Sequence, residues 1–210
     1  MDTPKSQASQ GLSPRVPVIT LLMVGAAVLV AQFPSWSSWL VYDRSAILSG
    51  EIWRMFTGHW VHFSTSHLLY DSLALAIAGW IIETQRLPNF GWLCLLTPWL
   101  ISGVLLLVEP HMERFGGLSA LAATAVVYLA LCGLHEKTHW RWMCLATLLV
   151  FVGKMIYEIT TGHMMFVTAD NIVRVSAASH IFGAIIALMF YGWAKMVPRG
   201  NRIRYQFNAR

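Results

Sequence analysis

Long stretches without a single Asp, Glu, Lys or Arg constrain the fold of this chain more than any other feature. Four of them are long enough for a membrane-spanning helix, which needs about 20 apolar residues: 16–42, 87–108, 115–134 and 175–194. Charged residues make up only 12% of the chain, and its mean hydropathy is +0.55. So few charges could not cover this much apolar surface in a soluble protein, and the composition also excludes a disordered chain.

Two further apolar segments, 66–84 and 141–158, contain isolated polar residues. Together with a first span at about 16–33, they predict an all-α membrane protein with a bundle of six transmembrane helices. The connection 34–62 is rich in tryptophan, which favours the membrane interface, so we expect a structured first outer loop. The expected parts are a disordered N-terminus (1–15), a six-helix membrane domain (16–197) and a basic tail (198–210).

Lysine and arginine predict the orientation, because they are enriched in cytoplasmic loops. With six spans, the side that holds both termini carries ten of these residues, and the other side carries four. We therefore expect a multi-pass protein of a bacterial inner membrane, with both termini in the cytoplasm. The net charge of +5 comes largely from the basic tail, which we expect to contact anionic lipid headgroups and not nucleic acid.

Polar residues inside the predicted spans mark a candidate site, because such residues are costly in a bilayer and by default suggest function. His67 and Asp71 lie in the outer third of the second span, Ser119 lies about one turn inside the fourth, and His180 lies five residues into the last. These three spans all enter from the outer side, so the four residues are expected at the same depth. The topology was predicted from lysine and arginine alone, which makes this agreement independent support.

Such a set of residues is typical of nucleophilic catalysis. A serine becomes a good nucleophile only when a base removes its proton, and histidine is the usual base because it titrates near neutral pH. His67 and Asp71 are four residues apart and share a helix face, so they could offer donors to an oxyanion together with the backbone N–H of Ser119. Gly116 and Gly117 let the backbone before the serine approach its neighbours closely.

Each residue also has a structural interpretation. A serine near the end of a span commonly bonds its own helix, and a lone His180 can be an interhelical donor. His67 and Asp71 can pair with each other. Lys154 and Glu158, four apart on the fifth span, are expected to form a structural ion pair, with Lys154 reaching toward the headgroups. It is the conjunction at one depth that favours a functional site.

Four motifs occur in order along residues 50–194: EIWR in the first loop, two histidines five apart with Asp71 four residues later, GLSA at the start of the fourth span, and HIFGAIIA in the last. The histidines are His62 and His67, GLSA contains Ser119, and HIFGAIIA begins at His180. This set resembles the rhomboid family of intramembrane serine proteases, in which the corresponding patterns are His, His and Asn, then Gly-x-Ser-Gly, then His-x-x-Gly-x-x-x-Gly.

The resemblance implies a Ser119–His180 dyad that needs no third carboxylate. It implies oxyanion support from His67, the position of Asp71, the backbone of Ser119 and the close approach at Gly117. It further implies that the substrates are transmembrane helices with small, helix-destabilising residues, cut near the outer face without a metal or an organic cofactor. The short six-span form is similar to the rhombosortase-like branch, which is thought to process secreted proteins with glycine-containing C-terminal anchor helices.

Single positions refine the comparison. Ala120 and Ala187 replace glycines of the family pattern, and both remain small. Asp71 replaces an asparagine; a protonated carboxyl would donate to an oxyanion as an amide does, whereas a charged one would repel it and could instead bond a protonated histidine. Glu83 matches a family glutamate at the inner end of the second span, where we expect a structural ion pair with Arg86.

Two other functions fit parts of the sequence. An inactive relative that binds transmembrane helices would explain Asp71 but not the intact serine and histidine. A metal or haem protein would draw on His59, His62, His67 and His180, but the first two precede the second span and are misplaced for a shared centre. The three cysteines have no metal-type spacing, and a transporter would show paired broken spans, which the sequence lacks.

Overall fold

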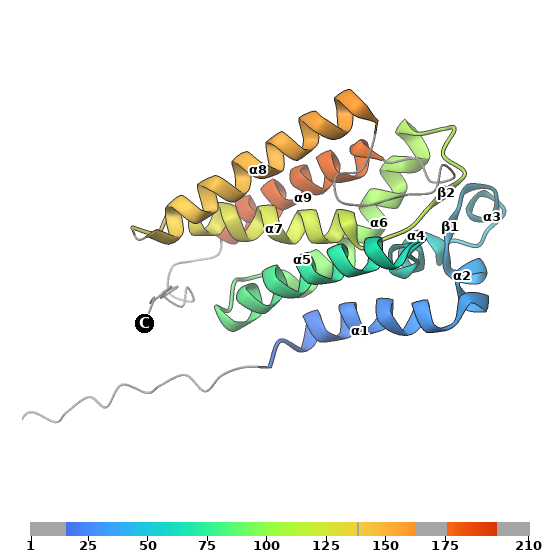
Figure 1. Ribbon diagram of the computed structural model, residues 1–210, viewed down its shortest axis with the longest axis horizontal. Coiled ribbons are helices and arrows are strands. Elements are labelled where there is room, and N and C mark those ends of the chain that lie inside the picture. Colours follow the sequence, from blue (N-terminus) through green and yellow to red (C-terminus); the bar gives the residue numbers. More distant parts are fainter. Residues whose placement is uncertain (1–15, 138, 163–175, 197–210) are drawn as a thin grey trace, which may run out of the picture.

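The computed structural model describes residues 16–137, 139–162 and 176–196. Within them, six long helices form an all-α bundle, as predicted (Figure 1): α1 (Val18–Gln32), α5 (Thr65–Thr84), α6 (Phe90–Val108), α7 (Ser119–Gly133), α8 (His139–Thr161) and α9 (Ala177–Met196). The predicted disordered segment 1–15 and the basic tail 198–210 lie outside the described residues.

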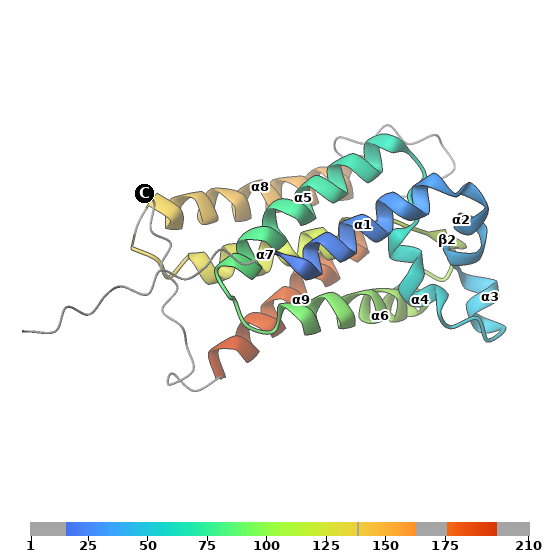
Figure 2. The ribbon, with the colours of Figure 1, turned by 90° about the horizontal axis from the view of Figure 1, so that it is seen from below.

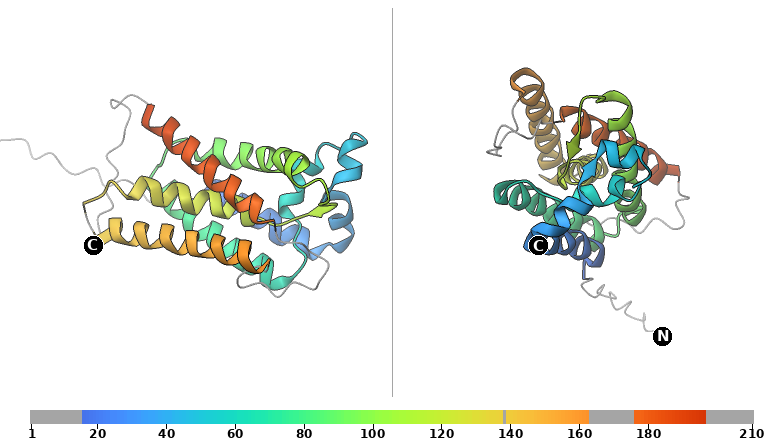
Figure 3. Two further views of the ribbon diagram at one scale, coloured as in Figure 1. Left: turned by 90° about the horizontal axis from the view of Figure 1, so that it is seen from above. Right: turned by 90° about the vertical axis from the view of Figure 1, so that its right-hand side faces the viewer.

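Helix α7 is the centre of this bundle. It packs against α5, α6, α8 and α9, and ten of its 15 residues are buried. Figure 3 shows it in yellow among its neighbours when the bundle is seen end-on. Alanine fills much of its sequence, and these small side chains let the surrounding helices approach its backbone closely. Because α7 is surrounded in this way, residues in its first turn lie inside the protein.

The start of α7 differs from the prediction. The uncharged stretch 115–134 predicted a span from Phe115, but Phe115 lies in a two-residue strand, β2 (Arg114–Phe115), and the helix begins only at Ser119. Strand β2 pairs antiparallel with β1 (Tyr42–Asp43), with Phe115 opposite Tyr42. Gly117 has a φ of +120°, a backbone conformation that no helix contains, and this residue keeps the helix from starting earlier.

The first loop is folded, as its tryptophans predicted. It contains the short helices α2 (Pro34–Leu40), α3 (Arg44–Leu48) and α4 (Arg54–Thr57) and the 3₁₀ helix η1 (Gly58–Trp60), which gather at one end of the bundle (Figure 2). The buried guanidinium of Arg54 holds this loop together. It donates to the carbonyl oxygens of Ser38 and Val41 at 2.9 and 3.1 Å, and it pairs with Glu51 at 2.6 Å.

The helices support a multi-pass membrane protein. Among the described helices, α5, α6, α8 and α9 are each long and apolar enough to cross a bilayer. Helix α1 passes that test only together with α2, from which it is bent by 116°, and α7 is shorter, with 15 residues. The prediction of six complete spans therefore stays a prediction, although the six helices of the bundle correspond to the six predicted segments.

Glu83 has a different partner from the one predicted. Its carboxylate accepts hydrogen bonds from the backbone N–H groups of Ile19 and Thr20, at 3.1 and 2.7 Å, and from the hydroxyl of Thr20 at 2.6 Å. Among the ion pairs of the described residues, none joins it to Arg86. A carboxylate satisfies the free N–H groups and the positive end of a helix, so Glu83 fastens the start of α1 to the end of α5.

Candidate active site

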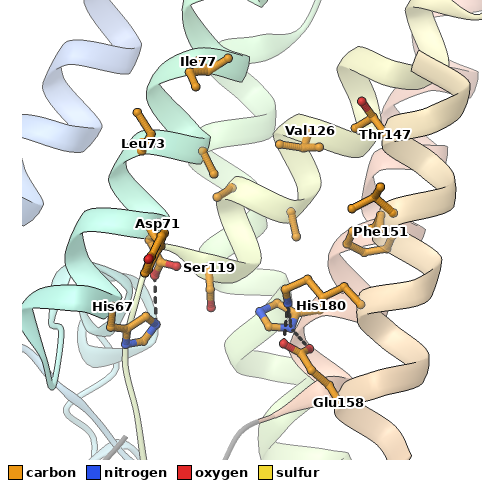
Figure 4. Close-up of a pocket in the computed structure, with 16 residues that line it drawn as sticks. His67, Asp71, Leu73, Ile77, Ser119, Val126, Thr147, Phe151, Glu158 and His180 are labelled. Atoms are coloured by element: carbon orange, nitrogen blue, oxygen red, sulfur yellow. Dashed lines mark hydrogen bonds and ion pairs between the residues drawn. The ribbon is translucent and has the colours of Figure 1, made fainter. Parts of the chain in front are cut away.

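A cavity of about 380 Å³ lies between α5, α7 and α8. Most of its lining is apolar, but one end gathers six polar side chains from four helices: His67, Asp71, Ser119, Lys154, Glu158 and His180. Figure 4 shows that end, with Ser119 between the ring of His67 on one side and the ring of His180 on the other. The four residues expected at one depth therefore line one cavity, together with Lys154 and Glu158.

Gly116 and Gly117, which precede the serine, let the backbone pass close to the side chains that line this cavity. A Cβ atom on Gly117 would lie 2.6 Å from Cε1 of His67 and 3.1 Å from an oxygen of Asp71, and the positive φ of this residue is itself unfavourable for a side chain. A Cβ atom on Gly116 would lie 2.6 Å from the carbonyl oxygen of Val61. Only glycine fits at these two positions, as the close backbone approach predicted.

The hydroxyl of Ser119 is available for chemistry. Ser119 is the first residue of α7, it is half-buried, and it makes no side-chain hydrogen bond to any residue that the structure describes. Its hydroxyl points into the cavity (Figure 4). The first N–H groups of a helix have no partners inside the helix and carry a partial positive charge, so the position beside Ser119 favours a developing negative charge.

His180 reaches the same end of the cavity from α9 because α7 and α9 approach closely there. A Cβ atom on Gly183 would lie 2.9 Å from Oγ1 of Thr124 and 3.0 Å from the carbonyl oxygen of Ala120. Ala187, one turn further along α9, is fully buried. The small-residue spacing on this helix thus brings the backbone of α9 against the first turns of α7, beside Ser119.

Glu158 has a contact that the sequence interpretation did not predict. Its pairing with Lys154 is present as predicted, with Nζ to Oε1 at 2.6 Å. Its other oxygen, Oε2, lies 2.8 Å from Nδ1 of His180 on the neighbouring helix. The spacing within α8 indicated the first contact, whereas nothing local to either helix indicates the second. Only the depth of residue 158 near the outer end of its span could have suggested it.

His62 is a second residue whose place was missed. Its Nε2 lies 3.2 Å from Oδ2 of Asp71 and accepts the backbone N–H of Leu118 at 3.2 Å, while its Nδ1 lies 3.2 Å from the carbonyl oxygen of Trp60. Nε2 of His67 lies 3.0 Å from the same oxygen of Asp71, but the alignment is too poor for a hydrogen bond. Asp71 therefore lies between two imidazoles directly under the loop that precedes Ser119.

The contacts of His62 limit where its ring hydrogens can lie. Nδ1 donates to the carbonyl of Trp60, and a neutral ring then has no hydrogen on Nε2. Nε2 accepts from Leu118, so its contact with Asp71 is a hydrogen bond only if the carboxyl group carries the proton. A ring protonated on both nitrogens would instead donate from Nε2 to an ionised Asp71, so the contact fits either a donating or an accepting carboxyl group.

Comparison with known proteins gives one family match. The family model of the Rhomboid domain matches residues 49–196, which include the later part of the first loop with α4 and η1, and the helices from α5 to α9. The chain belongs to the rhomboid family. The comparison with curated proteins found no match, so the family model alone carries this assignment.

Rhomboid proteins are intramembrane serine proteases that act on membrane proteins within the bilayer, and the matched segment contains every polar residue at the end of the cavity. The part of the chain that the structure describes holds no group of three His, Cys, Asp or Glu side chains arranged to bind a metal ion.

His59, one of the residues considered for a metal or haem centre, faces away from the rhomboid cavity. Its Nε2 lies 3.1 Å from the carbonyl oxygen of Pro98 and 3.2 Å from the hydroxyl of Ser102, both on α6. Complete burial lowers the pKa of His59 to about 4, so it is a neutral packing residue under the first loop.

Proposed function

We propose that this rhomboid is an active serine endopeptidase that cleaves transmembrane segments near the outer face of the membrane, with Ser119 as nucleophile and His180 as general base. The observation that carries the proposal is the presence of both side chains at the polar end of an otherwise apolar cavity. The free hydroxyl of Ser119 and the fixed ring of His180 support it further.

The proposed reaction follows from these positions. The oxygen of Ser119 attacks the carbonyl carbon of the scissile bond while His180 accepts the hydroxyl proton, and the oxyanion forms beside the start of α7. His67, Asp71 in its donating form and the backbone N–H of Ser119 would stabilise that charge, with Gly117 allowing their approach. His180 then gives its proton to the leaving amine, and water releases the acyl group.

The cavity walls support a transmembrane helix as the substrate. The walls come from α5 and α8, and their side chains Leu73, Ile77 and Val150 are 53%, 56% and 70% exposed, as expected where a cavity opens toward lipid. A helix must unwind before its backbone can reach Ser119. Glycine in a helix costs about 1 kcal/mol relative to alanine, so glycine-containing segments unwind most readily. We therefore propose rhombosortase-type processing of C-terminal anchors that contain glycine.

The proposal also covers the location and the orientation of the protein in the membrane. We propose a bacterial inner membrane as the location, with both termini in the cytoplasm, a disordered segment 1–15, the membrane domain 16–197 and a lipid-contacting tail 198–210. The lysine and arginine distribution supports this orientation. The partners are then membrane-anchored substrates and the bilayer itself.

A fluorophosphonate serine probe tests the proposal directly. Purified protein in detergent is treated with the probe, and wild type is compared with Ser119→Ala and His180→Ala. We expect wild type alone to be labelled, because only an activated serine attacks the phosphorus at a useful rate. Co-expression with a secreted protein that ends in a glycine-containing anchor then tests the substrate class, with release of the anchor as the expected result.

An unlabelled wild type, beside a labelled rhomboid of known activity, would favour the alternative: an inactive family member that binds transmembrane helices. The charge of Asp71 would then be the first suspect, since an ionised carboxylate repels an oxyanion. Retention of a transmembrane helix by the unlabelled protein in a co-purification would support that second function.

A further inference from the structure

The contact between Glu158 and His180 joins two helices at the polar end of the cavity. Both side chains are almost completely buried, with 1% of Glu158 and 3% of His180 exposed, and Oε2 lies 2.8 Å from Nδ1 (Figure 4). The two residues lie on α8 and α9, 22 positions apart in sequence. Such a short bond between a carboxylate and an imidazole is strong and directional.

We propose that Glu158 is a positioning residue for the reaction, acting through His180. A carboxylate only accepts, so the hydrogen of their bond must lie on Nδ1 of the ring. The neutral imidazole then has its free electron pair on Nε2, the nitrogen that must accept the proton of Ser119. This inference rests on the proposed serine protease function and adds to it a third member, which the dyad of the family pattern lacks.

The proton balance of the step is simple. The O–H bond of Ser119 breaks, its oxygen forms a bond to the carbonyl carbon, and the proton moves to Nε2 of His180. Glu158 keeps its negative charge throughout and stabilises the imidazolium that forms. When the leaving amine takes the proton from Nε2, the ring returns to the same tautomer, because the bond from Nδ1 to Glu158 has not changed.

Lys154 sets the orientation of the carboxylate. Its ammonium lies 2.6 Å from Oε1 of Glu158 and 3.3 Å from Nδ1 of His180, with 27% of its side chain exposed. An ammonium group only donates, so a bond from Lys154 to Nδ1 would require the opposite tautomer. The contacts of Glu158 with Lys154 and with His180, at 2.6 and 2.8 Å, are both shorter and favour the hydrogen on Nδ1. Glu158 is thus bound at both oxygens: Oε1 accepts from Lys154, and Oε2 accepts from His180.

This orientation makes Glu158→Gln a sharp test. The ammonium of Lys154 will hold the amide oxygen of the glutamine, which turns the NH₂ group toward Nδ1 of His180. An NH₂ group donates, so it selects the tautomer with hydrogen on Nε2, which cannot accept from Ser119. We expect the rate of fluorophosphonate labelling to fall by at least about a hundredfold. The loss is about 10⁴-fold when a triad histidine is held in the wrong tautomer.

A second substitution should restore part of the rate. In the double variant Glu158→Gln and Lys154→Met, the amide is free to turn its oxygen toward Nδ1, so we expect labelling about tenfold faster than in Glu158→Gln alone. Glu158→Asp retains the charge and should also be labelled faster than Glu158→Gln. A purely structural ion pair changes the folded fraction, so it predicts equal labelling rates per folded molecule for Glu158→Gln and the double variant.

Glu83→Gln is the matched control. Glu83 is a structural carboxylate that fastens α1 to α5, away from the cavity, so its variant should unfold at a lower temperature and still be labelled at the wild-type rate per folded molecule. Thermal unfolding of every variant gives the folded fraction. An unlabelled wild type overturns the proposed function. A labelled wild type with equal rates for Glu158→Gln, or with both Glu158 variants unfolded, overturns only the positioning role of Glu158.

Discussion

Gly117 meets two structural requirements of the candidate active site. Its φ of +120° turns the chain into α7, and its missing side chain leaves the space that His67 and Asp71 occupy. These are two separate demands, one on the backbone and one on the space beside it. Gly50 meets the first demand only: its φ is +109°, and a Cβ atom there would meet nothing within 4 Å.

The pair Gly117→Ala and Gly50→Ala separates the two demands. Both variants should be destabilised by about 1–3 kcal/mol because alanine is strained at positive φ. Only Gly117→Ala should lose labelling by the serine probe, because its Cβ atom displaces the ring of His67. Rates per folded molecule and thermal unfolding of both variants check this. Equal labelling of the two would show that the space beside Gly117 is not needed for catalysis.

Asp71→Asn tests the hydrogen between Asp71 and His62. In the wild type, that hydrogen can be lost as the pH rises, whereas an amide keeps its hydrogens. We therefore expect the labelling rate of Asp71→Asn to depend less on pH than that of wild type between about pH 6 and 9, with normal folding. Asp43→Asn, in the first loop, is the control. Identical pH profiles of wild type and Asp71→Asn would remove any special role of the carboxyl group.

Polar residues within single spans could be predicted from the sequence, whereas the contacts between helices could not. Ser119, His180, His67 and Asp71 could be selected from the sequence because polar residues stand out in apolar spans, and all four line the cavity. Glu158 and His62 gain their contacts from the packing of α8 on α9 and of the first loop on α5. No periodicity within a single helix carries that information.

At the scale of elements, the contact of α7 with α9 determines whether serine and histidine can meet. Gly183 lies against Thr124 and the carbonyl of Ala120, the residue that follows the serine. The small-residue spacing in α9 indicated a packing face. It could not indicate the start of α7, because the uncharged stretch continues through Phe115 into residues that form a strand with the first loop.

Gly183→Val should separate these two helices. The added side chain would collide with α7, so we expect about 1–3 kcal/mol of destabilisation and a labelling rate reduced at least tenfold. Gly192→Val on the same helix is the matched control, since a Cβ atom at Gly192 meets nothing within 4 Å. Labelling and thermal unfolding are measured for both. A wild-type rate in Gly183→Val would show that the close approach is not required.

At the scale of the whole molecule, the fold class was predictable because apolar stretches and their lengths are written in the sequence. The arrangement of the helices around α7 was not, since any of the six segments could have been central by composition. The orientation in the membrane follows from charge and stays a prediction. This orientation determines where the site lies, because the reverse orientation would place the polar end of the cavity on the cytoplasmic side.

Reporter fusions test the orientation. A fluorescent protein that folds only in the cytoplasm, joined to the C-terminus, should fluoresce, and alkaline phosphatase, which needs an oxidising compartment, should be inactive at the same position. A fusion of each reporter in the connection between α6 and α7 serves as the internal comparison and should give the reverse. Active phosphatase at the C-terminus would contradict both the orientation and the outer-face position of the site.

The short first helix has a consequence for the lipid around the protein. At 1.5 Å per residue, the 15 residues of α1 span about 22 Å, less than the roughly 30 Å of hydrocarbon in a typical bilayer. Leu21, Leu22 and Leu29 of α1 are 52%, 62% and 50% exposed, so we expect lipid tails to contact this helix directly. Hydrophobic mismatch should thin the bilayer on this side. We expect cleavage to be faster in short-chain than in long-chain lipid vesicles.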